Sequence, residues 1–379
     1  MTLVVAPASI FDPAVPVIGD VIYGDSDKAI SGAALAQTFL FVSGNNFVYG
    51  DAAAIAGRGQ GGDDSFAVMG LEETNTVLFG DAWTIAGAAR GGDDLIHTVG
   101  GFEVYGDALE ISGRARGGDD RIDAVTTDLD TASAKGDCTY MHDRAHGGDD
   151  RIFGRTVFGD SVFMDDQTRG GDDRLFCRDR GGLLIGDAGE MSADSVGGDD
   201  VLVARRAATT LYGDAASLSD RAQGGDDYLH NQGRFSEPFG DARYMLDQTS
   251  GGDDVVSGSR FGEVLYGDAQ YMYDESSAGD DVLLGGPGDD VLYGDARVFT
   301  STGARGADRF VFAADCGRDM IGDFQPGIDV IDLRPLGYAS FAQLIVGERG
   351  GDSVVDLPGP NRITVDGIAH LTAADFLLA

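Results

Sequence analysis

Residues 266–295 read YGDAQYMYDESSAGDDVLLGGPGDDVLYGD and contain the two motifs that decide the fold. One is a Gly-Asp dipeptide, often Tyr-Gly-Asp-Ala, and the other is an acidic pair, usually Gly-Gly-Asp-Asp; both recur along most of the chain. The aspartates of the dipeptide are Asp25, Asp51, Asp81, Asp107, Asp137, Asp160, Asp187, Asp214, Asp241, Asp268 and Asp295. The second acids of the pairs are Asp64, Asp94, Asp120, Asp150, Asp173, Asp200, Asp227, Asp254, Asp281 and Asp290.

The spacing of the two motifs predicts a solenoid. From Asp51 onward, the acidic pair begins 12 residues after each dipeptide aspartate, whereas the return distance varies between 11 and 18 residues. The last six dipeptide aspartates are each 27 residues apart. One half of each coil is therefore expected to be fixed in length, while the other half accepts insertions, as in repeat proteins with one looped side.

Apolar residues recur in register with both motifs, which distinguishes a packed repeat from a disordered acidic chain. Examples are Ile55, Ile85 and Ile111 after the dipeptide, and Ile96 and Ile122 after the acidic pair. A third set, mostly Tyr and Phe, precedes the dipeptide glycines. The segments are too short and too rich in glycine for helices. We predict an all-β fold, a parallel β-roll or β-solenoid of about eleven coils with about three short strands each.

Composition restricts the classes of partner. Acids outnumber bases 64 to 27, giving a net charge of −37, which argues against nucleic acid and an anionic membrane surface as partners. The hydrophobic fraction of 42% argues against disorder. No apolar run is long enough to span a membrane. The three cysteines are far apart and odd in number, so no disulfide framework is expected.

Stacked coils place equivalent aspartates above one another, about 4.8 Å apart, where bare carboxylates repel each other. Either their pKa values rise until many are protonated, or cations lie between the coils. Carboxylates and glycine carbonyls are all oxygen donors, the ligands that calcium prefers. The five histidines are not clustered, so they predict no transition-metal site.

Gly285-Gly286-Pro287-Gly288-Asp289-Asp290-Val291-Leu292-Tyr293 matches the nonapeptide GGxGxDxUx at every specified position. The chain therefore resembles the RTX, or hemolysin-type, calcium-binding repeat family. The resemblance implies several Ca²⁺ ions bound between coils, with Asp290 as a side-chain ligand. By the shared Gly-Asp-Asp pattern it implies the same role for Asp64, Asp94, Asp120, Asp150, Asp173, Asp200, Asp227, Asp254 and Asp281. The dipeptide aspartates from Asp51 to Asp295 are expected to form a second row. The family usually repeats every 9 residues with 18 per coil, whereas this chain repeats at 27.

The period breaks from Gly306, and the last quarter resembles the C-terminal module of proteins exported by type I secretion. Segments such as Ile321-Gly322-Asp323-Phe324 and Leu371-Thr372-Ala373-Ala374-Asp375-Phe376-Leu377 carry this resemblance. A solenoid cap is an alternative role, and the two roles are compatible. We expect an N-terminal segment or cap at 1–18, a solenoid at 19–305 and a β-rich cap with the secretion module at 306–379. The N-terminus lacks the pattern of a Sec signal peptide.

Function is predicted from the repeats, because they leave little room for a catalytic domain. We expect a secreted or cell-surface structural or adhesive protein, part of a surface layer, filament or matrix, that folds on calcium after export and self-associates. No HExxH or GxSxG motif is present. The alternative is a secreted polysaccharide lyase or epimerase built on a β-helix. Residues 2–6 are expected either to add a strand to a neighbouring molecule or to fold back as a cap.

Overall fold

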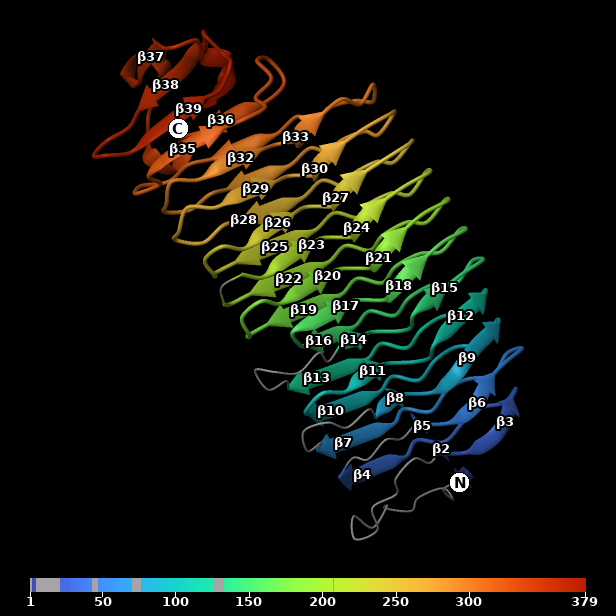
Figure 1. Ribbon diagram of the computed structural model, residues 1–379. Helices are drawn as coiled ribbons and strands as arrows, with labels where there is room; N and C mark the ends of the chain where they lie inside the picture. Colours follow the sequence, from blue (N-terminus) through green and yellow to red (C-terminus); the bar gives the residue numbers. More distant parts are fainter. Residues whose placement is uncertain (1, 5–20, 43–46, 70–75, 126–132, 207) are drawn as a thin grey trace. The chain divides into compact units, whose positions relative to one another are not determined.

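The computed structural model describes residues 2–4, 21–42, 47–69, 76–125, 133–206 and 208–379. The chain divides into two compact units, Met1–Gly198 and Asp199–Ala379. Both consist of short parallel strands stacked as a β-solenoid, with about ten turns in all and a period near 27 residues (Figure 1). The predicted all-β solenoid is therefore confirmed.

In the first unit, each turn passes through three parallel sheets, which we name A, B and C. Sheet A contains β1 (Thr2–Val4), β2 (Val21–Tyr23), β5 (Phe47–Tyr49), β8 (Val77–Phe79), β11 (Glu103–Tyr105), β14 (Ser133–Lys135), β17 (Thr156–Phe158) and β20 (Leu183–Ile185). Sheet B contains β3 (Ser26–Ile30), β6 (Ala52–Ile55), β9 (Ala82–Gly87), β12 (Glu110–Gly113), β15 (Tyr140–Met141), β18 (Ser161–Met164) and β21 (Ala188–Met191). Sheet C contains β4 (Thr38–Val42), β7 (Ser65–Met69), β10 (Leu95–Val99), β13 (Arg121–Val125), β16 (Arg151–Phe153) and β19 (Arg174–Cys177).

The second unit repeats this arrangement. Its sheet A contains β23 (Thr210–Tyr212), β26 (Glu237–Phe239), β29 (Val264–Tyr266), β32 (Val291–Tyr293) and β35 (Arg318–Ile321). Sheet B contains β24 (Ala215–Leu218), β27 (Ala242–Met245), β30 (Ala269–Met272) and β33 (Ala296–Phe299). Sheet C contains β22 (Val201–Ala204), β25 (Tyr228–Asn231), β28 (Val255–Ser257), β31 (Val282–Leu284), β34 (Arg309–Val311), β36 (Val330–Asp332) and β40 (Phe376–Leu377).

The two sequence motifs lie at two of the three corners of each turn. The Gly-Asp dipeptide joins sheet A to sheet B, as Gly80-Asp81 does between β8 and β9. The acidic pair joins sheet B to sheet C, as Asp93-Asp94 does before β10. The corner from sheet C back to sheet A has no fixed motif. Insertions are therefore confined to one corner, as the variable return distance predicts.

Apolar residues form ladders along the core because strand pairing brings equivalent positions together. Ile85 pairs with Ile111 in sheet B, and Ile96 pairs with Ile122 in sheet C, and all four are fully buried. The aromatic residues before the dipeptide also stack, with Phe79 and Tyr105 ring centroids 4.7 Å apart. This spacing matches the distance between neighbouring strands. All three predicted ladders are confirmed.

The C-terminal end of the second unit departs from the solenoid pattern. In sheet A, β35 pairs in parallel with β39 (Arg362–Val365), which pairs antiparallel with β38 (Asp352–Asp356), itself antiparallel to β37 (Ile345–Arg349). Three short 3₁₀-helices complete this region: η1 (Arg334–Leu336), η2 (Phe341–Gln343) and η3 (Ala373–Asp375). The parallel ladder of sheet A thus ends in an antiparallel meander.

At the N-terminal end of the first unit, β1 pairs in parallel with β2 of the same chain. Of the two expected roles for this segment, the structure shows the fold-back for Thr2–Val4, while residues 5–20 lie outside the described part. Cys138, Cys177 and Cys316 are buried, and none of them forms a disulfide bond. No helix among the described residues is long and apolar enough to cross a membrane.

Candidate metal-binding site

The twenty predicted ligand aspartates are all buried, each 2% exposed or less. Nineteen of them fall into two columns, one at each motif corner. Column 1 contains the dipeptide aspartates Asp51, Asp81, Asp107, Asp137, Asp160 and Asp187 in the first unit, and Asp214, Asp241, Asp268 and Asp295 in the second. Column 2 contains Asp64, Asp94, Asp120, Asp150 and Asp173 in the first unit, and Asp200, Asp227, Asp254 and Asp281 in the second.

Each column 1 carboxylate accepts a hydrogen bond from the backbone N–H of a glycine 11 residues later in its own turn. Gly92 donates to Asp81 at 2.9 Å, and Gly252 donates to Asp241 at 2.8 Å. This bond spans the sheet B strand and joins the two motif corners. It explains why the distance between the motifs is fixed at 12 residues, because one residue more or less would misplace the glycine N–H.

Column 2 carboxylates join successive turns. For Asp94 to Asp173 in the first unit and Asp227 to Asp281 in the second, Oδ1 accepts from the backbone N–H of the equivalent aspartate one turn earlier, as Asp120 accepts from Asp94 at 2.6 Å. In the second unit, Asp254 accepts from Asp227 at 2.7 Å. The first acids of the pairs behave differently. Asp93 and Asp119 are exposed, and the Oδ1 of each accepts from the backbone N–H of the equivalent aspartate one turn later. Only the second acid of each pair therefore faces the interior.

Asp290, the residue in the complete nonapeptide, lies at a different corner. It directly precedes β32 of sheet A, whereas column 2 residues precede strands of sheet C. Its Oδ1 accepts from the Glu263 N–H at 2.8 Å, and its own N–H donates to Asp319 at 3.0 Å. The predicted equivalence of Asp290 with column 2 is therefore wrong, because the nine residues from Asp281 to Asp290 include strand β31 of sheet C and place the nonapeptide at the corner between sheet C and sheet A.

Many of these carboxylates retain one buried oxygen with no hydrogen-bond partner within the described residues. These oxygens belong to Asp51 and Asp81 of column 1 and Asp64, Asp94, Asp120 and Asp150 of column 2 in the first unit, and to Asp241, Asp268, Asp227, Asp254, Asp281 and Asp290 in the second. A buried acceptor without a partner costs free energy. Repetition at a dozen places requires a compensating proton or cation.

The unpartnered oxygen of column 2 faces a backbone carbonyl across a glycine. A Cβ at Gly80 would collide with both the Asp94 Oδ2 and the carbonyl oxygen of Gly106. The same arrangement surrounds Gly240, where the Asp254 Oδ2 meets the Gly267 carbonyl. Two acceptors thus approach the same point with no donor between them. A protonated carboxyl could donate there, or a cation could be held by both oxygens.

Burial raises the pKa values of these carboxyl groups, and neighbouring carboxylates raise them further. The pKa of Asp51 rises to about 10, first through burial and then through the charge of Asp81. The pKa of Asp64 rises to about 9 through burial and the charge of Asp51, a residue of the other column. For Asp94 it lies well above the ordinary value, through burial and then Asp81. Without cations, protonation is the way to keep these columns folded.

The geometry limits how a cation could be held. No group of three or more His, Cys, Asp or Glu side chains in the described residues converges in a way that could hold a metal ion. A cation at the columns would therefore need backbone carbonyl oxygens as well as carboxylates. An all-oxygen set of this kind fits calcium, which accepts six to eight oxygen ligands in flexible geometry. The donor chemistry therefore fits the expected ion.

The columns continue beyond the predicted solenoid boundary at residue 305. Asp308 accepts from the Asp281 N–H at 3.0 Å, and Asp329 accepts from the Asp308 N–H at 3.1 Å, so both extend column 2. Sequence reasoning missed Asp308 because its pair reads Ala307-Asp308 instead of Asp-Asp. The signal was present, since Asp308 follows Asp281 by 27 residues.

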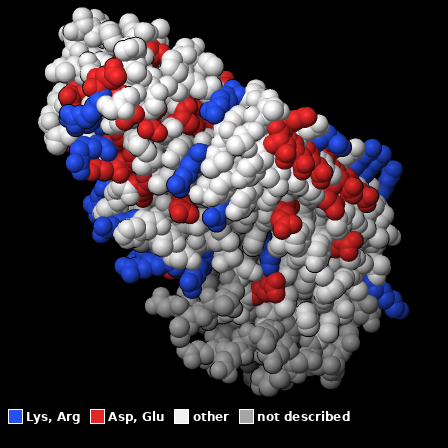
Figure 2. All heavy atoms as spheres, turned by 45° about the horizontal axis from the view of Figure 1, so that its top comes forward, with Lys and Arg blue, Asp and Glu red and all other residues white. Residues whose placement is uncertain are grey.

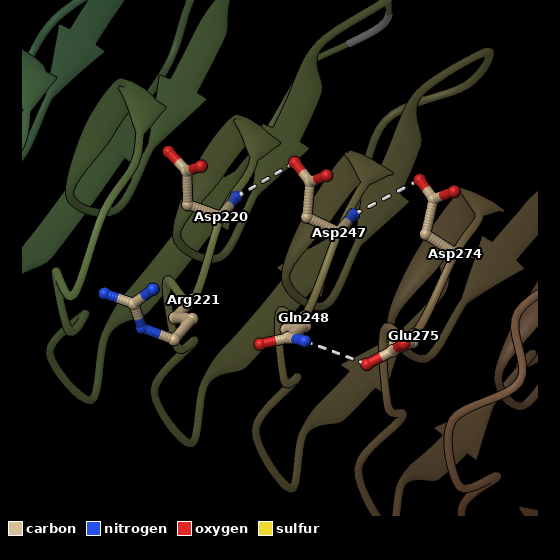
Figure 3. A pocket seen from close by; sticks show the side chains of 6 residues that line it. All are labelled: Asp220, Arg221, Asp247, Gln248, Asp274 and Glu275. Atoms are coloured by element: carbon tan, nitrogen blue, oxygen red, sulfur yellow. Dashed lines mark hydrogen bonds between the residues drawn. The ribbon is translucent and has the colours of Figure 1, made fainter.

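A second acidic row lies on the outside of the second unit (Figure 3). Asp220, Asp247 and Asp274 have left-handed φ values of 58–60° and repeat every 27 residues. The carboxylate of Asp247 accepts from the Asp220 N–H at 3.2 Å, so each turn is tied to the next. Together with Arg221, Gln248 and Glu275, these residues line an open groove of about 280 Å³. The sequence-based prediction missed this row.

The burial of the columns also changes what the surface presents. Although acids outnumber bases 64 to 27, the face in Figure 2 carries basic side chains beside acidic ones. The twenty column and nonapeptide aspartates are hidden in the interior. These twenty carboxyls correspond to about half of the formal net charge of −37, and in the interior a small ion rather than a basic macromolecule would compensate them.

The glycines beside column 2 provide a direct test of this packing. We expect Gly240→Ala to destabilise the fold by roughly 3 kcal/mol, because its Cβ would meet the Gly267 carbonyl and Asp254 within a closed turn. Gly347→Ala is the matched control, since nothing lies within 4 Å of a Cβ there. Thermal unfolding in calcium measures both. Equal melting temperatures for the two variants would contradict the close approach.

Comparison with models of known protein families finds no match for this chain, and a search of curated proteins finds none with significant similarity.

Proposed function

We propose that the protein is a secreted calcium-binding repeat protein of the RTX type that acts as a structural or adhesive scaffold outside the cell. The observation that carries this proposal is the pair of interior aspartate columns with unpartnered oxygens among the described residues. Those of column 2 face glycine carbonyls, and those of column 1 lie near the carboxylate of the next turn. A proton on each carboxyl would satisfy these oxygens only at a cost in folding free energy at neutral pH, because the same carboxyls ionise near pH 4 in the unfolded chain. A divalent cation satisfies both kinds of oxygen while the carboxylates stay ionised. Calcium is the member of this class with the matching oxygen preference.

Under this proposal, the carboxylates of column 1 and column 2, with the neighbouring glycine carbonyls, hold several calcium ions. Asp290 and Asp319 form an additional candidate pair, since each has a buried oxygen without a partner in the described residues. When bound, calcium supplies positive charge that offsets carboxylate repulsion. The chain contributes the hydrogen bonds that fix the carboxylates at the two motif corners.

Calcium linkage suits a protein that folds after export. Ligand that binds only the folded state stabilises it in proportion to the logarithm of ligand concentration. Low calcium inside the producing cell would leave the acidic chain unfolded, and higher calcium outside would fold it. The resemblance of residues 306–379 to the type I secretion module supports this route. The protein would then act in the medium or at the cell surface.

A scaffold role predicts calcium-dependent assembly. We expect the full chain to sediment as large ordered particles in millimolar calcium, because neutralised columns remove self-repulsion between molecules. Without calcium we expect no such particles. Sedimentation velocity and electron microscopy across a calcium titration measure this, with magnesium at equal ionic strength as the control. A monodisperse monomer at every calcium concentration would overturn the scaffold proposal and leave calcium binding untouched.

The groove in Figure 3 supports a second candidate, a polysaccharide-modifying enzyme. It places carboxylates of Asp247 and Asp274 in an open channel that crosses successive turns. If the protein depolymerises or epimerises a polysaccharide, Asp247→Asn is expected to abolish that reaction without changing the calcium dependence of folding. Assembly with no such reaction favours the scaffold.

A further inference from the structure

The last aspartate of column 1 is partnered in a way that Asp241 and Asp268 are not. In the second unit, Asp241 and Asp268 each keep a buried oxygen without a partner in the described residues. At Asp295, Oδ1 accepts from the Gly306 N–H at 2.7 Å. Its Oδ2 accepts from Arg305 Nη1 at 2.8 Å and from Gln325 Nε2 at 3.0 Å. Both oxygens of Asp295 are therefore satisfied.

The arginine comes from a position that is small in the preceding turns. The residue 10 positions after the column 1 aspartate is Gly251 for Asp241 and Ala278 for Asp268, but Arg305 for Asp295. A Cβ at Gly251 would collide with carboxylate oxygens of both Asp241 and Asp268. The small residue thus borders the space between successive carboxylates. At the end of the column, the guanidinium enters from this same position.

Arg305 is held by two contacts. Its guanidinium carbon lies 4.0 Å from the ring centroid of Phe299, and its Nη1 forms an ion pair with the fully buried Asp295 carboxylate. The side chain of Arg305 is 31% exposed, so it reaches the column from the surface. An arginine–aromatic stack and a charge-assisted hydrogen bond together fix its orientation.

The first unit shows a related ending at its first turn. Asp25 begins the dipeptide series, and its carboxylate accepts from the Gln37 Nε2 at 2.6 Å and from the Leu35 N–H at 2.8 Å. Gln37 occupies the place that an acid takes in later turns, and its N–H donates to Asp64. A side-chain donor therefore serves the terminal carboxylate here also.

We propose that Arg305 is a tethered counter-ion that replaces calcium at the C-terminal end of column 1, an inference that rests on the proposed calcium-binding function. The preceding turns need a bound cation between their carboxylates, whereas the turn around Asp295 contains the guanidinium of Arg305 in that role. The turn around Asp295 therefore stays folded at low calcium. It supplies an ordered end on which the calcium-dependent turns can stack.

Hydrogen exchange measured by mass spectrometry on the full chain tests this inference. In chelator, peptides covering 294–312 of the natural sequence are expected to exchange about tenfold more slowly than peptides covering 240–270. Arg305→Gln is expected to remove this difference in chelator only, and millimolar calcium is expected to restore protection. Arg305→Lys keeps the charge and is expected to retain most of the protection.

Arg234→Gln is the matched control, because Arg234 also stacks on an aromatic ring, 4.6 Å from Phe261. It is expected to leave the exchange of 294–312 unchanged in both conditions. Fast exchange of Arg305→Gln even in calcium would show a structural role for Arg305, and natural-like exchange in chelator would show no role. Either result overturns the inference. Calcium-independent exchange throughout the natural chain would instead overturn the proposed function.

Discussion

Removal of calcium at neutral pH is expected to abolish most of the β-sheet signal of this protein. Without calcium, each buried column carboxyl must either keep its charge or take up a proton that the unfolded chain would not hold at pH 7. Either alternative costs several kcal/mol per group. Short strands of two to six residues in parallel turns cannot offset such a cost. Far-ultraviolet circular dichroism during titration with chelator measures the loss, and added calcium should reverse it. An unchanged spectrum in excess chelator would contradict the metal proposal.

Acid provides the control that distinguishes cations from protons. Burial raises the pKa of Asp329 and of Asp319 to about 6, and that of Asp323 to about 7, from an ordinary value near 3.8. A folded-state pKa above the unfolded value gives stability that is present below about pH 4 and lost as the pH rises through the folded pKa. Metal-depleted protein is therefore expected to have most β-structure near pH 4 and to lose it progressively as the pH rises further. The column carboxyls contribute to this loss over a wider range, because the folded-state pKa is about 9 for Asp64 and about 10 for Asp51. Calcium-loaded protein should stay folded at pH 7.

The sequence predicted the fold well because every turn repeats the same physical constraints. Ile85 and Ile111 stand at equivalent places after the dipeptide, and strand pairing brings them together as predicted. The fixed 12-residue distance reflects one hydrogen bond, from glycine N–H to column 1 carboxylate, repeated in each turn. Because this spacing is fixed by a hydrogen bond within each turn, one amino-acid sequence is enough to predict it.

The candidate site was less predictable where the sequence motif of a residue does not correspond to its position in the turn. The complete nonapeptide drew attention to Asp290, yet chain length between motifs places Asp290 at another corner. Conversely, Asp308 lacks the acidic pair but keeps the 27-residue period and extends column 2. The ion pair between Arg305 and Asp295 depends on an arginine at a position that is small in the preceding turns. A single substitution of this kind breaks the repeat, so the repeat pattern does not predict it.

The end of the solenoid shows the same limit. Asp323 accepts from the N–H groups of Gly294, Asp295 and Ala296 at 2.9–3.1 Å. In earlier turns, the backbone carbonyl of the next dipeptide aspartate performs this role, as Asp107 does for Asp81 and Ala82. A side chain thus replaces a backbone group where the stack ends. The Gly322-Asp323 dipeptide repeats the motif, but its different use depends on the missing next turn.

Leu229→Asp is expected to prevent folding of the second unit even in saturating calcium. Leu229 is fully buried in sheet C, where it pairs with Leu202 on one side and Val256 on the other. A carboxylate in this apolar ladder has no glycine carbonyl or turn N–H to face, and its burial costs several kcal/mol. Loss of the leucine side chain alone costs about 2–5 kcal/mol.

The matched control lies one residue away in the same strand. Tyr228 is 43% exposed, so Tyr228→Asp is expected to change stability by about 1 kcal/mol or less. The insertion at 126–131, which the sequence offers as a tolerant site, lies outside the described residues. Circular dichroism and thermal unfolding in calcium compare the two variants, and Met245→Asp, fully buried in sheet B, should behave like Leu229→Asp. Equal stability of Leu229→Asp and Tyr228→Asp would show that the strand faces are assigned wrongly. If the apolar ladder tolerated a carboxylate, an acid could be buried in this core without calcium. The argument that the two aspartate columns need calcium would then fail.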